Sequence, residues 1–170
     1  MAKPKFYALK AITMGAPAAD GGMGTVLTEI LGATVKGTAT LTSTTPETTE
    51  VEIEESDEIY DELETKAAVW TLAASTYNVS AITMQKFFGG TIATGVWSPP
   101  VGGTTVKVHQ SVVAETRSGI KVSFVKMSLV GTAALAFDKA KLGQIDWTAK
   151  VLAPDKAGIP AFSIDFGVDA

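Results

Sequence analysis

Short stretches in which apolar and polar residues alternate recur along the chain and predict an all-β or mostly β fold. The clearest is residues 49–55, where Val51 and Ile53 alternate with three glutamates. Threonine, valine, isoleucine and aromatic residues are frequent in these stretches, and Gly, Pro, Asp and Ser separate them. The expected strands are residues 6–13, 35–42, 49–55, 66–74, 104–116, 119–130 and 144–152, with a last apolar stretch around 162–166.

Two of these strands are expected to form a hairpin, because residues 104–116 and 119–130 flank a short turn that ends in glycine. Along the second strand the apolar residues change sides after Phe124. Such a switch indicates either a β-bulge or a strand that is buried on both faces.

One segment has helical spacing instead, with apolar residues at Tyr77, Ala81, Met84 and Phe88. Asn78 is the expected N-cap, and the glycine pair after Phe88 is expected to end the helix. We see no internal repeat. The sequence therefore predicts a single domain over residues 1–170, a β-sandwich or β-barrel with one flanking α-helix. Two long connections interrupt it, a glycine-rich loop at about 15–32 and an acidic loop at about 54–64.

The composition is that of a globular chain: 170 residues, 46% hydrophobic and 19% charged, which is enough to build a core. No apolar run approaches the roughly 20 residues of a membrane span, and we expect no membrane partner. The basic residues 1–6 lead into no long apolar segment, so no secretory signal is expected. Cysteine is absent, which suits assembly in a reducing cytoplasm.

The polar residues argue against catalysis and against tight binding of nucleic acid. A net charge of −4 is unfavourable for gripping phosphates. The chain has one histidine, His109, and one arginine, Arg117, and His109 falls in an alternating strand as a solvated or interface residue. The glycines at 21–24 lack the Gly-Lys-Ser/Thr of a phosphate loop. We expect no enzyme, no catalytic residue, no cofactor and no metal.

Acidic residues are concentrated between positions 47 and 64, where no Lys or Arg occurs. Three interpretations are open: a solvated strand face and loop, a calcium site, or a functional negative surface. The calcium interpretation lacks the Asp-x-Asp-x-Asp-Gly spacing. The acidic residues are Glu47, Glu50, Glu52, Glu54, Glu55, Asp57, Glu58, Asp61, Glu62 and Glu64.

A negative surface has a specific use in a ring of subunits. Glu50, Glu52 and Glu54 fall on one strand face and would form a band that repels phosphate, so that DNA slides past it. The following loop mixes acids with Ile59 and Tyr60, which suits docking on a neighbouring subunit. Long threonine-rich strands also leave open edges that a self-assembling subunit can use.

Taken in order, a set of short segments resembles the tail tube (major tail) proteins of long-tailed bacteriophages, most closely those of phages that infect Bacteroidetes. The resemblance covers nearly the whole chain and departs from the family pattern after Asp57, where a proline is expected. The segments are ADGGMGT at 19–25, LTEILG at 27–32, VEIEESD at 51–57, FFGGT at 87–91, GVWSPP at 95–100, TRSG at 116–119 and VLAP at 151–154.

The resemblance implies a structural virion protein that forms hexameric rings, which stack into a tube for DNA delivery into the host. Its partners would be other copies of itself, the tail tip, tape measure and terminator proteins, and DNA that passes without specific binding. It would be assembled in the host bacterial cytoplasm and reside in the virion tail. The glycine-rich loop and the acidic loop are the candidate ring-to-ring contacts, specifically Asp20, Met23, Leu27, Asp57, Ile59, Tyr60 and Glu62.

Two alternatives stay open at this point. Tube proteins of contractile injection and secretion systems share the fold class, so the resemblance does not fix the tail type. The chain could instead be a monomeric β-sandwich that binds a sugar or a protein partner, with Trp97 and Tyr60 as exposed aromatic anchors. That alternative predicts a stable monomer whose affinity for a ligand depends on Trp97.

Overall fold

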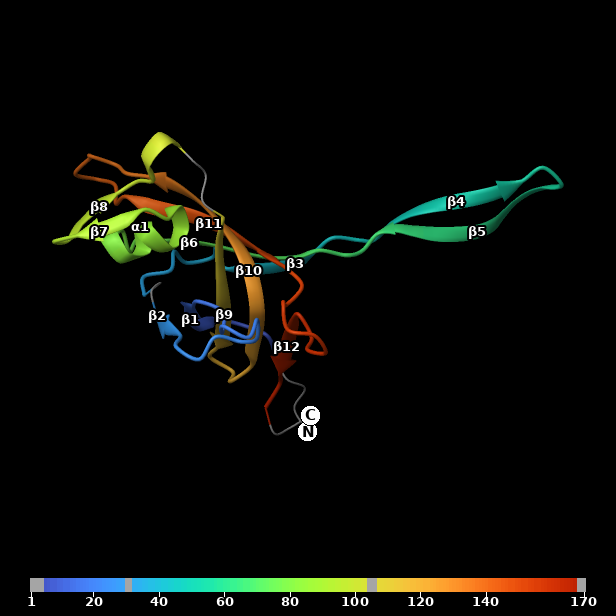
Figure 1. Ribbon diagram of the computed structural model, residues 1–170, viewed down its shortest axis with the longest axis horizontal. Coiled ribbons are helices and arrows are strands. Elements are labelled where there is room, and N and C mark those ends of the chain that lie inside the picture. The colour runs from blue at the N-terminus through green and yellow to red at the C-terminus, as the bar shows by residue number, and fades with distance from the viewer. Residues whose placement is uncertain (1–4, 30–31, 104–106, 168–170) are drawn as a thin grey trace.

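The computed structural model describes residues 5–29, 32–103 and 107–167, and it is mostly β with one α-helix in these ranges (Figure 1). This confirms the predicted fold class. The elements are β1 (Leu9–Gly15), β2 (Thr28–Glu29), β3 (Thr40–Ser43), β4 (Glu47–Ile53), β5 (Ser56–Lys66), β6 (Trp70–Thr76), α1 (Ala81–Phe88), β7 (Thr91–Ala93), β8 (Val96–Ser98), β9 (Val108–Thr116), β10 (Lys121–Ala134), β11 (Gln144–Val151) and β12 (Phe162–Asp165), with a 3₁₀ turn at Val101–Gly103.

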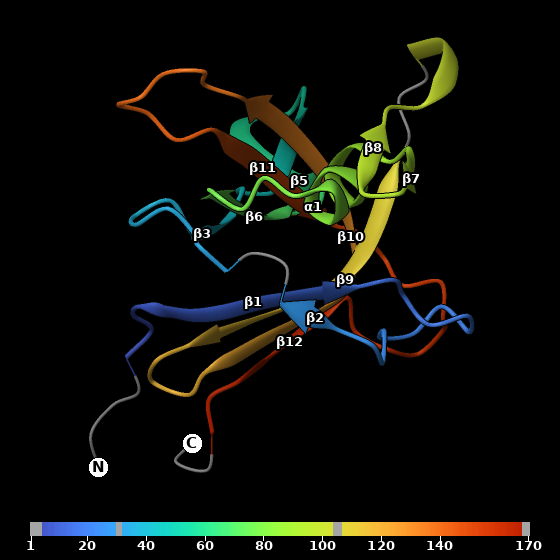
Figure 2. The ribbon, with the colours of Figure 1, turned by 90° about the vertical axis from the view of Figure 1, so that its left-hand side faces the viewer.

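An antiparallel sheet forms most of the molecule, in the order β2-β1-β9-β10-β11-β6-β3, with β12 also paired to β10. The register of β10 against β9 shifts between Phe124 and Met127. At this bulge one neighbour of β10 changes from β12 to β11. Bulges increase local bend and twist, and the sheet curls into an open half-barrel (Figure 2).

The core lies inside this curl and is built from alternating strand positions. Along β11, Ile145, Trp147 and Ala149 are buried while the residues between them are exposed, as the sequence alternation predicts. Phe87 of α1 stacks on Trp147 with ring centroids 5.6 Å apart, so the helix covers one end of the core. The helix has eight residues and is the only one in the described ranges, and none there is long enough to cross a membrane.

The predicted hairpin is confirmed, and the change of sides along β10 corresponds to the first of its two interpretations, a β-bulge, whereas several element boundaries differ. The first strand begins at Leu9 instead of residue 6. Of residues 35–42, only the last three lie in a strand, β3, which ends at Ser43. The helix is capped by Ser80, whose Oγ accepts the Thr83 N–H at 3.3 Å, and not by Asn78. A small hairpin of β7 and β8, which is not among the expected strands, follows the helix. Residues 104–106, part of a predicted strand, lie outside the described ranges.

The acidic segment differs most from the expectation. Residues 56–66, expected to be largely loop, form β5, which pairs antiparallel with β4 around a two-residue turn at Glu54 and Glu55. Acidic residues have low strand propensity, and here cross-strand pairing outweighs that preference. The resulting hairpin projects away from the half-barrel (Figure 1). We call residues 45–68 the arm and the other described residues the body.

Candidate functional site

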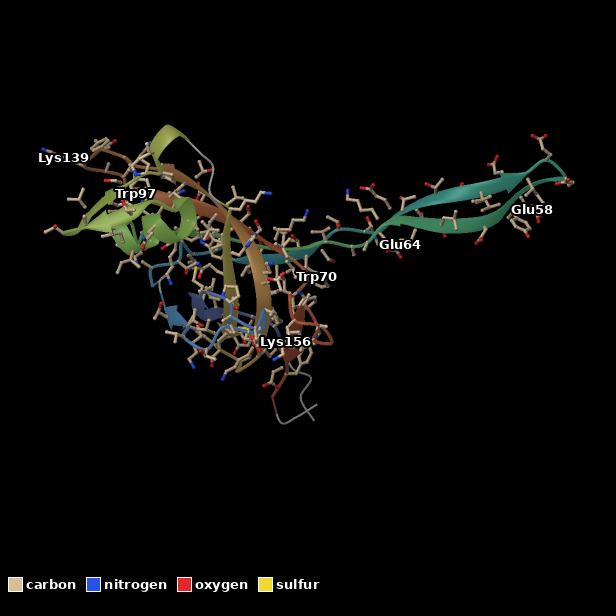
Figure 3. All side chains as sticks on the ribbon, in the orientation of Figure 1. Glu58, Glu64, Trp70, Trp97, Lys139 and Lys156 are labelled. Atoms are coloured by element: carbon tan, nitrogen blue, oxygen red, sulfur yellow. The ribbon has the colours of Figure 1, made fainter. Side chains whose placement is uncertain are left out.

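The arm is fixed to the body at its base by backbone pairing and aromatic packing. The Thr44 N–H donates to the Val69 carbonyl at 3.0 Å, and the Val69 N–H donates to Thr44 Oγ1 at 3.0 Å. Immediately after, the Trp70 ring packs against Phe162 at 5.1 Å between centroids. Phe162 in turn packs against the core residue Phe124 at 5.7 Å. The position where the arm leaves the body is therefore set by the core (Figure 3).

Beyond its base the arm has no core of its own. Among the described residues, β4 and β5 pair only with each other. The arm side chains that the structure describes are all exposed except Val51, which is half-buried. Tyr60 is 70% exposed, and Ile59 and Leu63 are each 55% exposed. A lone two-stranded hairpin in water is at best marginally stable, and the arm buries little apolar surface that could stabilise it.

The two faces of the arm differ in chemistry. The register pairs Glu50 with Glu62 and places Glu52 two residues further along the same face. The opposite face carries Val51, paired with Asp61, and Leu63, paired with Thr49, so it is less acidic but not free of charge. Like charges directly opposite each other destabilise a hairpin, so the acidic face is unfavourable in isolation. It becomes favourable when a basic surface lies against it.

The charge of the chain is divided sharply between the arm and the rest. The arm contains ten acidic residues and one lysine, Lys66, which pairs with Glu47 at 2.7 Å near the base. Its formal charge is therefore −9. Because the whole chain carries −4, the remainder of the sequence carries +5. One copy therefore combines a strongly acidic projection with a remainder of opposite net charge.

The predicted lumen residues lie on this arm, although not all on one strand face. Glu50 and Glu52 are on β4, as expected, whereas Glu54 lies in the turn. Among the predicted ring contacts, Ile59, Tyr60 and Glu62 lie on β5. Asp57 falls within β5, but its side chain lies outside what the structure describes.

The other predicted ring contacts lie on the body, on the glycine-rich segment. Asp20 accepts hydrogen bonds from the Lys156 ammonium at 2.7 Å and from the Gly22 N–H at 3.0 Å, and the pairing with Lys156 lowers the pKa of Asp20. Gly21 has φ +78°, and a Cβ there would approach the Asp155 Cβ to 2.7 Å, so the close approach requires glycine. Met23 and Leu27 are half-buried.

The candidate contacts therefore form two separate groups. Asp20 lies beside Lys156 on the body, and Glu58 lies near the far end of the arm (Figure 3). A contact between copies that used both groups would join two different surfaces of the subunit.

Trp97 and His109, the other two residues considered as site candidates, both pack within the body. The indole Nε1 of Trp97 donates to the Gly89 carbonyl at 2.8 Å, and its ring lies 6.2 Å from Phe88. The expectation that Trp97 is an exposed loop anchor is wrong, because its ring packs against the helix end. His109 is half-buried on β9, opposite Ser128. The described residues contain no group of three or more acidic or histidine side chains placed to hold a metal ion.

Comparison with protein-family models and with curated proteins finds no match to this chain.

Proposed function

We propose that this chain is a self-assembling structural subunit, the tail tube protein of a long-tailed bacteriophage. The observation that carries the proposal is the arm: a long, acidic, two-faced hairpin whose side chains are almost all exposed. A subunit that uses its arm to reach another copy covers the exposed Ile59, Tyr60 and Leu63. The mostly β body and the sequence resemblance support the same class. Hexameric rings and their stacking come from the resemblance.

The open half-barrel also supports assembly. β2 and β3 stand at the margins of the main sheet, β2 leaves most of β1 unpaired on that side, and no described strand joins the two margins. Monomeric β proteins usually cover such margins or block them with charge and proline, because an unpaired edge recruits other strands. In a tube, strands of neighbouring subunits would occupy these edges and continue the sheet around the channel.

Reversing the charge of acidic residues on the arm distinguishes two possible roles for them, lining the channel and docking on another copy. If Glu50, Glu52 and Glu54 line the channel, their replacement by lysine leaves tubes intact but lowers infectivity of a phage that carries the variant. If the acids dock on another copy, the same variant assembles poorly because attraction becomes repulsion. We expect the second result, measured by sedimentation velocity of the purified variant at low and physiological salt.

A matched variant in which the same three residues become glutamine is the control. It removes the charge without introducing repulsion, and we expect it to assemble more weakly than the unmodified chain but better than the lysine variant. Tubes of normal length from the lysine variant together with normal infectivity would remove both roles from these residues.

A further inference from the structure

We infer that the open margin of the half-barrel receives the arm of a second copy of this chain. We call this margin the seam, formed by residues 6–12 on one side and residues 32–41 on the other, with Arg117 at one edge. The inference rests on the proposed self-assembly and adds to it the surface on which the arm binds.

The seam is a groove large enough for an extended chain. Its outer part, about 670 Å³, runs between residues 8–12 and residues 32–39. A second hollow shares Ala8, Leu9 and Ala39 with it and reaches inward to Phe124 of the core. The groove thus lies at the open side of the half-barrel, between β1 and the segment that precedes β3.

Backbone groups along the seam favour a strand as the occupant. β2 pairs with β1 only at Thr13 and Met14, and no described strand pairs with Leu9–Ile12 on that side. β4 and β5 each also have an unpaired outer edge. Strand addition to such an edge satisfies main-chain donors and acceptors of both partners.

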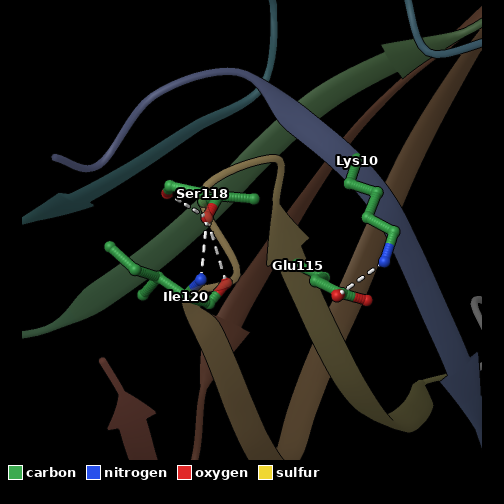
Figure 4. A network of polar contacts seen from close by, with 5 residues as sticks. Lys10, Glu115, Ser118 and Ile120 are labelled. Atoms are coloured by element: carbon green, nitrogen blue, oxygen red, sulfur yellow. Dashed lines mark hydrogen bonds and ion pairs between the residues drawn. The ribbon is translucent and has the colours of Figure 1, made fainter. Parts of the chain in front are cut away.

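The rim of the seam is basic. Lys10, Lys36 and Arg117 all line its outer part. Lys10 pairs with Glu115 at 2.8 Å (Figure 4). Lys36 and Arg117 make no ion pair with any described residue. These two cations can therefore pair with Glu50, Glu52 and Glu62 of an arriving arm.

The inner part of the seam is apolar and suits the other face of the arm. Phe6 and Tyr7 border it and are 57% and 58% exposed, and Leu41 and Leu72 lie deeper. An arm paired edge-on with β1 would turn Val51 and Leu63 toward these residues and its acids toward the basic rim. The face with Glu50, Glu52 and Glu62 thus matches the basic rim, and the face with Val51 and Leu63 matches the apolar inner part except at Asp61.

The absence of cysteine in the chain allows a direct test by cross-linking between two engineered copies. Copies that carry Tyr60→Cys are mixed with copies that carry Lys36→Cys and a tag of different mass, and a short bis-maleimide is added. Both positions are exposed, so folding is expected to be retained and is checked by circular dichroism. The matched control replaces Lys36→Cys with Lys139→Cys, another exposed lysine at the far end of the body (Figure 3).

Docking raises the local concentration of the two thiols to the millimolar range, so we expect at least about tenfold more mixed dimer from the Lys36 mixture than from the Lys139 mixture at micromolar protein. Assembled particles with equal yields from both mixtures would overturn the seam assignment and leave the proposed function standing. Copies that stay monomeric at all concentrations, also after addition of preformed tail-tip complexes as nuclei, and give no mixed dimer would overturn both.

Discussion

Replacing the arm, residues 45–68, with Asn-Gly is expected to leave the body folded and to abolish assembly. Thr44 and Val69 are already hydrogen-bonded across the base, so a two-residue type I′ turn can connect them without strain. The removed side chains are almost all exposed, and β4 and β5 pair with no body strand. The core therefore loses little, whereas the proposed contact with another copy is lost entirely.

The measurement combines thermal unfolding with light scattering on a sizing column. We expect the melting temperature to change by no more than a few degrees, which corresponds to about 1 kcal/mol in a domain of this size. The control exchanges only Glu54 and Glu55 for Asn-Gly, which keeps the arm and its length. Assembly of the armless chain to the same particles as the unmodified chain would show that the arm has no role in self-association.

The second large effect concerns the core. Phe124 is fully buried and packs against Phe162, which supports Trp70 at the base of the arm. Phe124→Ala is expected to lower the free energy of unfolding by about 3–5 kcal/mol through lost burial and the cavity left behind. Because domains are stable by only about 5–15 kcal/mol, this loss is a large share of the total free energy of unfolding.

Phe137→Ala is the matched control for this loss, since Phe137 lies fully exposed in the connection between β10 and β11. Its expected effect on the free energy of unfolding is within about 0.5 kcal/mol. Urea titration of both variants, followed by tryptophan fluorescence, compares the two values. Equal destabilisation by the two substitutions would contradict the location of the core.

The sequence predicts those strands in which apolar and polar residues alternate. β11 and the β9–β10 hairpin follow the expected residues because one face of each packs on the core. The bulge after Phe124 is visible in the sequence as a change of side. By contrast, β5 is missed because its acids and scattered apolar residues have no core to alternate against. Its strand conformation comes from pairing with β4.

The candidate site is predictable in part. The acidic run and its mixture of Ile59 and Tyr60 are plain in the sequence, and so is the imbalance between an acidic segment and a basic remainder. The seam is not, because Lys10, Lys36 and Arg117 are far apart in the chain and meet only through the sheet order. That order depends on contacts at long sequence separation, which no local pattern records.

The central claim is that the chain builds a tube from copies of itself. Negative-stain electron microscopy of the purified protein at high concentration, at low salt where screening is weak, tests it most directly. We expect hollow tubes or stacked rings with six-fold symmetry, and their disappearance when the arm is removed. Uniform monomers under these conditions, also after addition of preformed tail-tip complexes as nuclei, would contradict the account.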